Sequence, residues 1–282
     1  MKNSIKYYVS NTASRVLLGE KVTEFKNAKL FSIHILEFNS NILHFEYKLL
    51  RHSTEGNAII HKWIENIDEF QNRLIVHYNF DTKNISIKNL SDLQEHWKKS
   101  FKSLLKNKFP MKGGNVMVEE TEKVLFNEKQ FEKQFLGYTF LRAFLNGLSN
   151  ISTNSDLVLE KYFGDLDLIL KLETEELNDN NTFKSTAKIN EDLFDKKKLN
   201  KIIRDFTHTI DAKAELEIDM EEIYELDEDN FLKQADLYLD TSVISGFYHI
   251  TNAHQVQQIS ENEFLERINI QEKSNRHTFL AE

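Results

Sequence analysis

Four acidic residues occupy every second position in one stretch of the second half of the chain. The stretch AELEIDMEEIYEL, residues 214–226, alternates them with apolar residues, which predicts a strand with one face in the core and one face of carboxylates. Like charges along one strand face repel. We therefore expect this acidic ladder to be solvated, to pair with lysines such as Lys233, or to be held for a cation or a basic partner. Its members, the candidate partner-binding residues, are Glu215, Glu217, Asp219 and Glu221.

Five further residues have side chains that could carry chemistry: His34, His44, His77, Asp165 and Asp167. Imidazoles gathered on an outer strand face bind zinc, and two carboxylates on one strand face bind a divalent cation or act as an acid/base pair. Polar pairing across a hairpin, such as His34 with Glu46, explains the histidines without a metal. Carboxylates two positions apart are common. No catalytic, cofactor-binding or metal-binding residue is therefore assigned.

The usual catalytic signatures are absent from the sequence. It contains no GxSxG, HExxH, GxGxxG or P-loop pattern. Ser103 and Lys106 match SxxK, but they fall in a lysine-rich amphipathic stretch without the companion motifs of serine acylation. The chain has no cysteine, which excludes disulfides, thiolate metal sites and cysteine nucleophiles. An enzyme would need a nonstandard site built from the five histidines and aspartates, and no cofactor is expected.

The net charge of -9 is unevenly divided along the chain. Residues 1–150 hold 22 Lys and Arg against 16 Asp and Glu, and residues 151–282 hold 14 against 29. So acidic a second half argues against nucleic-acid binding, which needs cations to neutralise phosphates. It suits another protein with a basic surface, or contact between the two halves. The first residues show no signal-peptide pattern and no segment has the length of a membrane span, so a cytoplasmic location is expected.

Two hairpins are predicted in the first half. Residues 29–51 place their odd-numbered apolar residues on one face if residues 39–41 form the loop, which sets His34 opposite Glu46 and Leu36 opposite His44. Residues 73–88 form the second hairpin, with Phe80 facing Ile85. A strand is expected over 58–64, and a short helix is the alternative there.

Two helices are predicted in mid-chain, separated by the break PMKGGN at residues 110–115. The first runs from Ser91 to Phe109, with one apolar stripe. The second runs from Glu128 to Leu148 after a cap at Asn127, and its apolar surface covers most of the circumference, so it is expected to be largely buried or to dock into a partner. Its polar strip consists of Glu132, Thr139, Arg142 and Asn146.

The second half returns to strands, expected around 163–174, 182–190, 214–226, 231–240 and 243–259, with a helix over 191–206. The predicted fold is α+β, with mostly antiparallel, meandering strands and mid-chain helices packed on the sheet. Residues 1–150 form a β-hairpin lobe that ends in the two helices, and residues 151–282 form an acidic β-rich lobe. Together they are expected to make one compact unit.

Three classes of function are compatible with these features. A non-catalytic interaction protein is favoured, as an adaptor, an immunity-type binder or a component of a larger assembly, because the charge is segregated and no catalytic constellation is visible. A carrier of a lipid or other apolar ligand is the alternative, with some of the 21 phenylalanines lining a pocket between curved sheet and helices. The third is an enzyme whose histidines and aspartates converge in one cleft.

Overall fold

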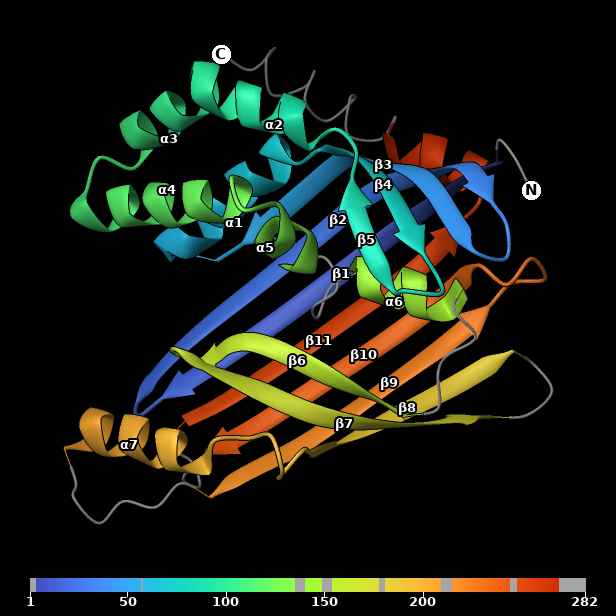
Figure 1. The fold of residues 1–282 in the computed structure, drawn as a ribbon. Coiled ribbons are helices and arrows are strands. Elements are labelled where there is room, and N and C mark those ends of the chain that lie inside the picture. Colours follow the sequence, from blue (N-terminus) through green and yellow to red (C-terminus); the bar gives the residue numbers. More distant parts are fainter. Residues whose placement is uncertain are drawn as a thin grey trace.

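The computed structural model describes residues 4–56, 58–134, 140–148, 154–177, 181–208, 215–243 and 248–268. Its strands form one antiparallel sheet of eleven strands in the order β5-β4-β3-β2-β1-β11-β10-β9-β8-β7-β6 (Figure 1). The α+β fold with an antiparallel, meandering sheet is thus confirmed. The strands are β1 Ser4–Leu18, β2 Lys21–Phe38, β3 Ile42–Glu55, β4 Arg73–Asn79, β5 Asn84–Ile87, β6 Asn154–Phe163, β7 Leu166–Glu176, β8 Thr182–Ile189, β9 Leu216–Leu226, β10 Leu232–Val243 and β11 Tyr248–Ile259.

The helices gather mainly on one face of the sheet, which we call the inner face (Figure 1). One group, α1 to α5, lies over the side of the sheet formed by β3 to β5, α7 lies at one end of the long strands, and α6 lies against β9 and β10. The helices are α1 Ile59–Phe70, α2 Leu90–His96, the π-helical turn η1 Trp97–Phe101, α3 Lys102–Lys108, α4 Lys112–Leu125, α5 Glu128–Lys133, α6 Phe140–Leu148 and α7 Lys196–Thr207.

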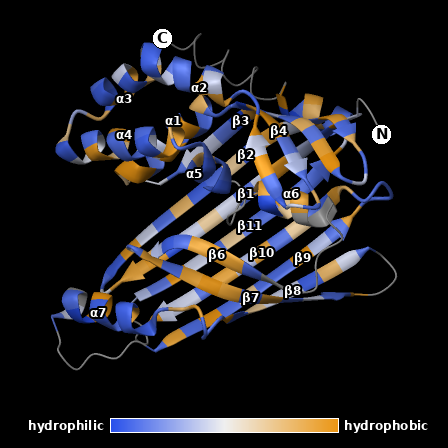
Figure 2. Cartoon of the chain, in the orientation of Figure 1, coloured by the Kyte–Doolittle hydropathy of each residue, from blue (hydrophilic) through white to orange (hydrophobic). Residues whose placement is uncertain are grey.

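Two separate apolar cores lie on the inner face. The larger one joins α1 to α6 to the inner positions of β2 to β5, β9 and β10, around buried side chains such as Trp97, Phe45 and Phe144. The smaller one joins α7 to β6, β7, β9 and β10 through residues such as Leu199 and Leu168. Hydrophobic residues line β6 and β7 in this second core (Figure 2). The two cores thus cover different parts of the same face of the sheet.

The outer face of the sheet is mostly exposed. A short helix over residues 261–268 follows β11. Its Phe264 stacks on Tyr7 with ring centroids 4.1 Å apart, next to the buried Leu30 and Ile259. Arg51 donates hydrogen bonds to the backbone carbonyl oxygens of residues 267 and 268. This helix thus covers one end of the outer face.

Both predicted hairpins of the first half exist, with small changes in register. His34 lies opposite Glu46 as predicted, but a bulge at Leu36 places His44 opposite Glu37 instead. In the second hairpin Tyr78, not Phe80, faces Ile85. The apolar face of each hairpin is buried in the larger core. In the second hairpin the shift is two residues, which keeps the same side chains on the same face, and in the first the one-residue shift is confined to the bulge.

Several elements differ from the prediction, and one of them is strand β6, because no strand was expected over residues 154–163. The first hairpin, β1 and β2, was not predicted. Residues 58–64 belong to helix α1, so the strand expected there is wrong and the alternative is confirmed. Residues 110–115 are not a simple break, because α4 begins at Lys112 and contains both glycines of the pair Gly113 and Gly114. A Cβ at Gly114 would meet the backbone oxygen of Phe109 at 2.2 Å, so glycine permits the close turn between α3 and α4.

The predicted helix from Glu128 to Leu148 is described as α5 and α6, and its residues 135–139 lie outside the described residues. Asn127 caps α5, since its Oδ1 accepts a hydrogen bond from the backbone N–H of Gln130. Phe140 to Leu145 are buried, as expected. Arg142, however, does not lie on a polar surface strip. It is 4% exposed and pairs with Glu222 on β9, which is fully buried.

Strands from both halves of the sequence share the sheet, because β1 pairs with β11 over twelve residue pairs from Tyr7 with Ile259 to Leu18 with Tyr248. The predicted lobe boundary near residue 150 lies outside the described residues. Within the described part of the chain, none of the helices is both long and apolar enough to cross a bilayer.

Candidate functional site

A cavity of about 510 Å³ opens on the inner face of the sheet, next to the larger apolar core. We call it the central cavity. Helix α1 contributes Ile64 and Asp68 to its lining, and Gln71 directly after this helix also lines it. Helix α6 contributes Phe140 and Leu141. The sheet contributes residues of β1, β2, β3, β4 and β11. The cavity is thus enclosed by one helix from each side and by the middle of the sheet.

The walls of the central cavity are largely aromatic and aliphatic. Phe31 of β2 contacts both Tyr47 and Phe140, with ring centroids 5.3 Å and 4.3 Å apart. Phe25 lies six residues before Phe31 on the same face of β2, and its ring centroid is 4.9 Å from that of His61. The apolar and aromatic wall residues are Phe25, Phe31, Tyr47, Ile64, Leu74, Phe140 and Leu141.

The floor of the central cavity is polar. Three successive inner-facing positions of β1 carry hydroxyl groups, and the strands on either side carry amides, a lysine and a histidine at the matching positions. These floor residues are Ser10, Thr12 and Ser14 of β1, Asn27 and Lys29 of β2, and Asn252 and His254 of β11. The register explains the grouping, because Thr12 pairs with Asn27 on one side and with His254 on the other.

Most floor groups have partners within the chain. Asn27 donates from Nδ2 to Thr54 Oγ1 over 3.0 Å. Lys29 Nζ lies 2.6 Å from Asp68 Oδ1, so the lysine on the floor and the aspartate on α1 form an ion pair across the cavity edge. This pair leaves the lining with no excess of either charge, because the lining residues include no other acid or base besides His254.

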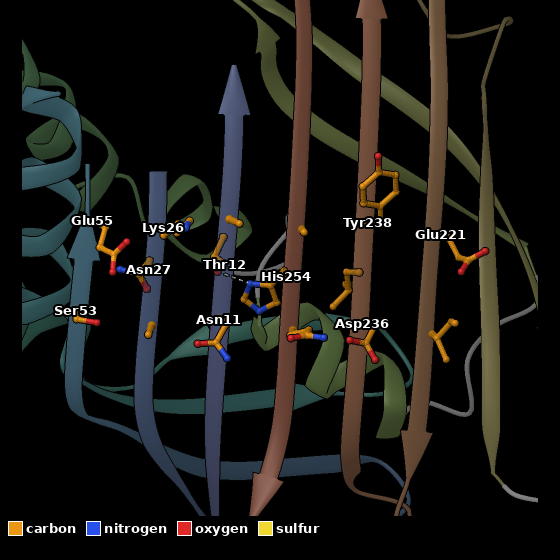
Figure 3. Close-up of a pocket in the computed structure, with 16 residues that line it drawn as sticks. Asn11, Thr12, Lys26, Asn27, Ser53, Glu55, Glu221, Asp236, Tyr238 and His254 are labelled. Carbon is orange, nitrogen blue, oxygen red and sulfur yellow. Dashed lines mark hydrogen bonds between the residues drawn. The ribbon is translucent and has the colours of Figure 1, made fainter. Parts of the chain in front are cut away.

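His254 is the titratable group at the centre of the floor. Its Nδ1 lies 2.7 Å from Thr12 Oγ1, and the two side chains are seen joined in Figure 3. Burial, together with the positive charges of Lys29 and Arg142, lowers the pKa of His254 to about 4. The ring is therefore neutral at pH 7. Its Nε2 is closed off from solvent and has no hydrogen-bond partner among the described residues.

A second hollow of about 790 Å³ adjoins the central cavity. The two share Gln134, just after α5, and Asn252 of β11. The second hollow continues between α4, α5 and the edge strand β6, where Val158 is 43% exposed. Together the two hollows make a path from the middle of the inner face to the edge of the sheet.

The acidic ladder lies on the outer face, away from the central cavity. Glu217, Asp219 and Glu221 alternate outward along β9, and Glu215 immediately precedes that strand. Asp240 of β10 lies directly opposite Asp219. The strand and its alternation were therefore predicted, whereas the second acidic strand beside it was not. A partner site at the ladder stays a prediction.

Cations neutralise only part of this outer acidic surface. Lys184 Nζ of β8 lies 2.6 Å from Glu221 Oε2, and the hydrogen bond and charge of that carboxylate raise the pKa of the lysine. Asp240 is 2.7 Å from His249 Nε2. Lys233, expected beside the ladder, pairs with Glu225 farther along the strand. Among the described residues, Glu217 and Asp219 form no ion pair.

A shallow hollow of about 420 Å³ crosses the outer face next to the ladder (Figure 3). Alanines of three neighbouring strands, Ala28, Ala13 and Ala253, contribute to its lining. The longer side chains around them include Lys26 and Tyr238, which point from different strands (Figure 3). Its lining includes Lys26, Glu55, Glu221 and Asp236, so this hollow is more highly charged than the central cavity and suits an apolar ligand less well.

The five histidines and aspartates do not converge. His44 and His77 are opposite each other on β3 and β4, with ring centroids 6.2 Å apart. Asp165 and Asp167 lie at the β6–β7 turn, toward the other end of the strand order. Asp165 is near Lys198 of α7, and Asp167 accepts a hydrogen bond from the backbone N–H of residue 161. No three His, Asp or Glu residues in the described part of the chain are placed to hold a metal ion.

Sequence reasoning missed every floor residue of the central cavity. The signal that could have found them is the turn between β1 and β2. Leu18 pairs with Lys21, so Gly19 and Glu20 form a two-residue loop, and Gly19 has φ of 59°. Glycine at the first loop position is typical of the type II′ turn that joins two antiparallel strands. A hairpin there would have placed Ser10, Thr12 and Ser14 on one face.

Comparisons with known proteins identify no family for this chain. No protein-family model and no curated protein matches it. Among solved structures, it is similar to lipovitellin, described for its lipid-protein interactions, at 9% identity and a TM-score of 0.44 over 92% of this chain and 25% of that chain. The chain therefore spans about a quarter of that structure.

Two other similar structures differ more. DynF from the dynemicin biosynthesis pathway of Micromonospora chersina has 5% identity and a TM-score of 0.22 over 93% of this chain and 84% of that chain. A putative outer membrane lipoprotein-sorting protein domain from Vibrio parahaemolyticus has 7% identity and a TM-score of 0.16 over 93% of this chain and 90% of that chain. All three TM-scores are below 0.5.

Proposed function

We propose that this chain is a non-catalytic binding protein that holds a small, largely apolar molecule in the central cavity. The observation that supports this function is the central cavity itself, where aromatic and aliphatic walls from the larger core and a polar floor surround about 510 Å³. Ligand sites in proteins are typically concave spaces of about 300 to 1,000 Å³ with apolar walls and a few polar groups. The central cavity fits that description in size and in lining.

The sequence of the floor is difficult to explain by packing alone. Most inner positions of the long strands are apolar outside the cavity, such as Tyr8 before the floor of β1 and Val256 after the floor of β11, both in the larger core. At the cavity they change to serine, threonine, asparagine and histidine. Burying such groups against apolar atoms would cost free energy. If these side chains instead face an open space that a ligand or water enters, the free-energy cost of burying them is removed.

Filling the central cavity tests this function. Ser14→Trp places a large side chain on the inner face of β1, and Arg15→Trp places the same side chain at the next position, where the arginine points outward and its side chain is 59% exposed. N-phenyl-1-naphthylamine, a neutral apolar dye that fluoresces in apolar surroundings, serves as the probe. We expect one dye per chain and a loss of affinity of at least about tenfold in Ser14→Trp only, because the indole occupies the dye's space.

Fluorescence titration gives the affinities, and circular dichroism shows whether both variants keep the strand content of the unmodified chain. Native mass spectrometry gives the number of dye molecules bound. A dye that fails to bind the unmodified chain, or that binds Ser14→Trp and Arg15→Trp equally well, would contradict the proposed function.

A second candidate function is binding of a basic partner at the outer acidic surface. It is favoured by the pairing of Asp219 with Asp240 across two strands and by the lack of an ion pair at Glu217 and Asp219 among the described residues. A fluorescent lysine-rich peptide is the probe. At low salt we expect Glu217→Gln with Asp219→Asn to weaken binding roughly threefold to tenfold, and moderate salt to weaken it in every variant.

Fluorescence anisotropy measures this binding. The matched control is Glu119→Gln with Glu120→Gln, which removes two exposed carboxylates from α4 instead. Equal losses in the two double variants would show a general charge effect and would count against a partner site at the ladder.

A further inference from the structure

One stretch of the helical group is strongly basic. Residues 96–118, from the end of α2 to the middle of α4, contain six lysines and no aspartate or glutamate. Two of these lysines form ion pairs, Lys99 with Glu95 and Lys102 with Glu122. The four that form no ion pair with a described residue are Lys98, Lys106, Lys108 and Lys112. Because the whole chain has a net charge of -9, this excess of positive charge is local.

Large apolar side chains are exposed in the same part of the molecule. They come from the first turn of α1, from α3, from the turn after α3 and from α4. Each is between 40% and 51% exposed, and they are Ile59, Ile60, Leu104, Met111 and Val116. Single exposed apolar residues are ordinary on a protein surface, but a group of them marks a surface that contacts another molecule.

Contacts between α1 and the end of α3 bring part of this group together. The ring of Phe109 packs edge-on against that of Trp63 on α1, with centroids 5.3 Å apart. Lys108 Nζ donates to Asn66 Oδ1 over 2.7 Å. Ile59 shares the face of α1 that carries Trp63 and Asn66, since residues four and seven apart lie on one side of a helix. Ile59 therefore lies next to the turn between α3 and α4.

We call this end of the helical group the helical tip. In Figure 1 the turn between α3 and α4 lies at the outer end of the group, away from α6. The exposed residues of the helical tip are Ile59, Ile60, Lys108, Met111 and Lys112. The helical tip thus combines aliphatic side chains with lysines.

This combination fits an anionic lipid surface. Lysines attract negatively charged headgroups, and aliphatic side chains enter the boundary between headgroups and acyl chains. Nucleic acid would use only the charge, and a single strand would also need aromatic side chains on which its bases stack. The aromatic rings of the basic stretch are not available for stacking, because Trp97, Phe101 and Phe109 are buried in the larger core.

Helix α1 connects the helical tip to the central cavity. Ile64 lines the cavity, and Ile60 lies one turn earlier on the same side of the helix. A lipid surface at the helical tip would therefore contact the helix that forms one wall of the cavity.

We propose that the helical tip docks on an anionic membrane surface, where its lysines lie among the headgroups and Ile60 and Met111 enter the boundary with the acyl chains. The docking goes beyond the proposed function and does not depend on it, because none of the five residues of the helical tip lines the central cavity. If both are correct, docking brings one wall of the cavity to the lipids.

Flotation with vesicles tests the docking. The unmodified chain is mixed at low salt with vesicles of phosphatidylcholine alone or with about 30% phosphatidylserine. We expect binding to the anionic vesicles only, and moderate salt should weaken it. Lys108→Gln with Lys112→Gln should lose roughly tenfold to thirtyfold in affinity, because each lysine near such a surface contributes about fivefold. Ile60→Gln with Met111→Gln keeps the charge and should lose about tenfold, because less apolar surface is buried in the lipid.

Matched controls lie elsewhere in the chain. Lys196→Gln with Lys197→Gln removes the same charge from exposed positions of α7. Val22→Gln with Leu193→Gln removes two apolar side chains at least as exposed as those of Ile60 and Met111. Each control should change the affinity by less than about twofold. Circular dichroism shows whether all four variants keep the strand content of the unmodified chain.

Several results would overturn the docking. They are no binding to the anionic vesicles, equal binding to both kinds of vesicle, and equal losses in the variants of the helical tip and in their controls. A duplex DNA oligonucleotide is the competitor for the charge. If it binds the unmodified chain and Ile60→Gln with Met111→Gln leaves the binding to vesicles unchanged, the helical tip is a general anion-binding surface instead. Because no vesicle measurement contains the dye, failure of the docking and failure of the proposed function are seen separately.

Discussion

Replacing Arg142 by methionine is expected to lower the free energy of unfolding by about 3 to 5 kcal/mol, the usual range for breaking a buried ion pair. Arg142 is 4% exposed on α6, and its partner Glu222 on β9 is fully buried. The Tyr224 hydroxyl donates to the other carboxylate oxygen over 2.5 Å. Methionine would fill a similar volume, but the carboxylate would remain in the core without the guanidinium that compensates its charge.

Urea unfolding followed by circular dichroism measures this loss. The double variant Arg142→Met with Glu222→Met removes both charges, and it should recover much of the lost stability, because apolar residues replace a buried ion pair at little cost. Arg267→Met is the matched control, since Arg267 pairs with Glu263 where both side chains are more than 40% exposed. It should change stability by less than about 1 kcal/mol. A double variant less stable than Arg142→Met would contradict this account of the pair.

Truncating Phe144 to alanine should cost about 3 to 5 kcal/mol, the range for removing a buried aromatic side chain. Phe144 is fully buried on α6. Its ring contacts those of Phe45, Tyr8 and Phe231, with centroids 5.5, 6.1 and 6.2 Å apart. These three rings come from β3, from β1 and from the turn before β10. The ring of Phe144 therefore joins strands that are far apart in the sheet order to the helix on the inner face.

The control for this truncation is Phe126→Ala at the end of α4, where the ring is 37% exposed and has Lys98 over its face at 4.7 Å. Its removal should cost about 1 to 2 kcal/mol, less than at Phe144, because part of the ring is already exposed and its loss leaves no closed cavity. Chemical unfolding of both variants gives the difference. Similar losses at the two sites would mean that α6 is not a central part of the core.

Elements with a regular apolar period could be predicted from the sequence. In β9 and in the hairpin of β2 and β3 the buried residues occupy every second position, so alternation alone identifies the core face. The stretch from Leu90 to Lys108 likewise shows its stripe, although it contains the π-helical turn η1. A strand was preferred over α1 because its short apolar run fits both periods.

The site could not be predicted in the same way, because its residues break the pattern that identifies strands. In β1 the inner positions Ser10, Thr12 and Ser14 are polar where a core strand would be apolar. The polar residues that form the cavity floor thus remove the apolar alternation by which strand β1 could have been predicted. Arg142 was assigned to a polar strip for a related reason. A charged side chain is rarely buried without a partner, and the partner of Arg142 is 80 positions away in the sequence.

The sequence by itself determined the α+β class and most core faces, because periodicity is a local property that neighbouring residues express together. Only the tertiary structure decided the site. Thr12 and His254 are 242 positions apart, and they meet because β1 pairs with β11 in the middle of the sheet. Pairing between the two ends of a chain depends on how the whole sheet assembles and curves. No local pattern in the sequence could therefore place the central cavity.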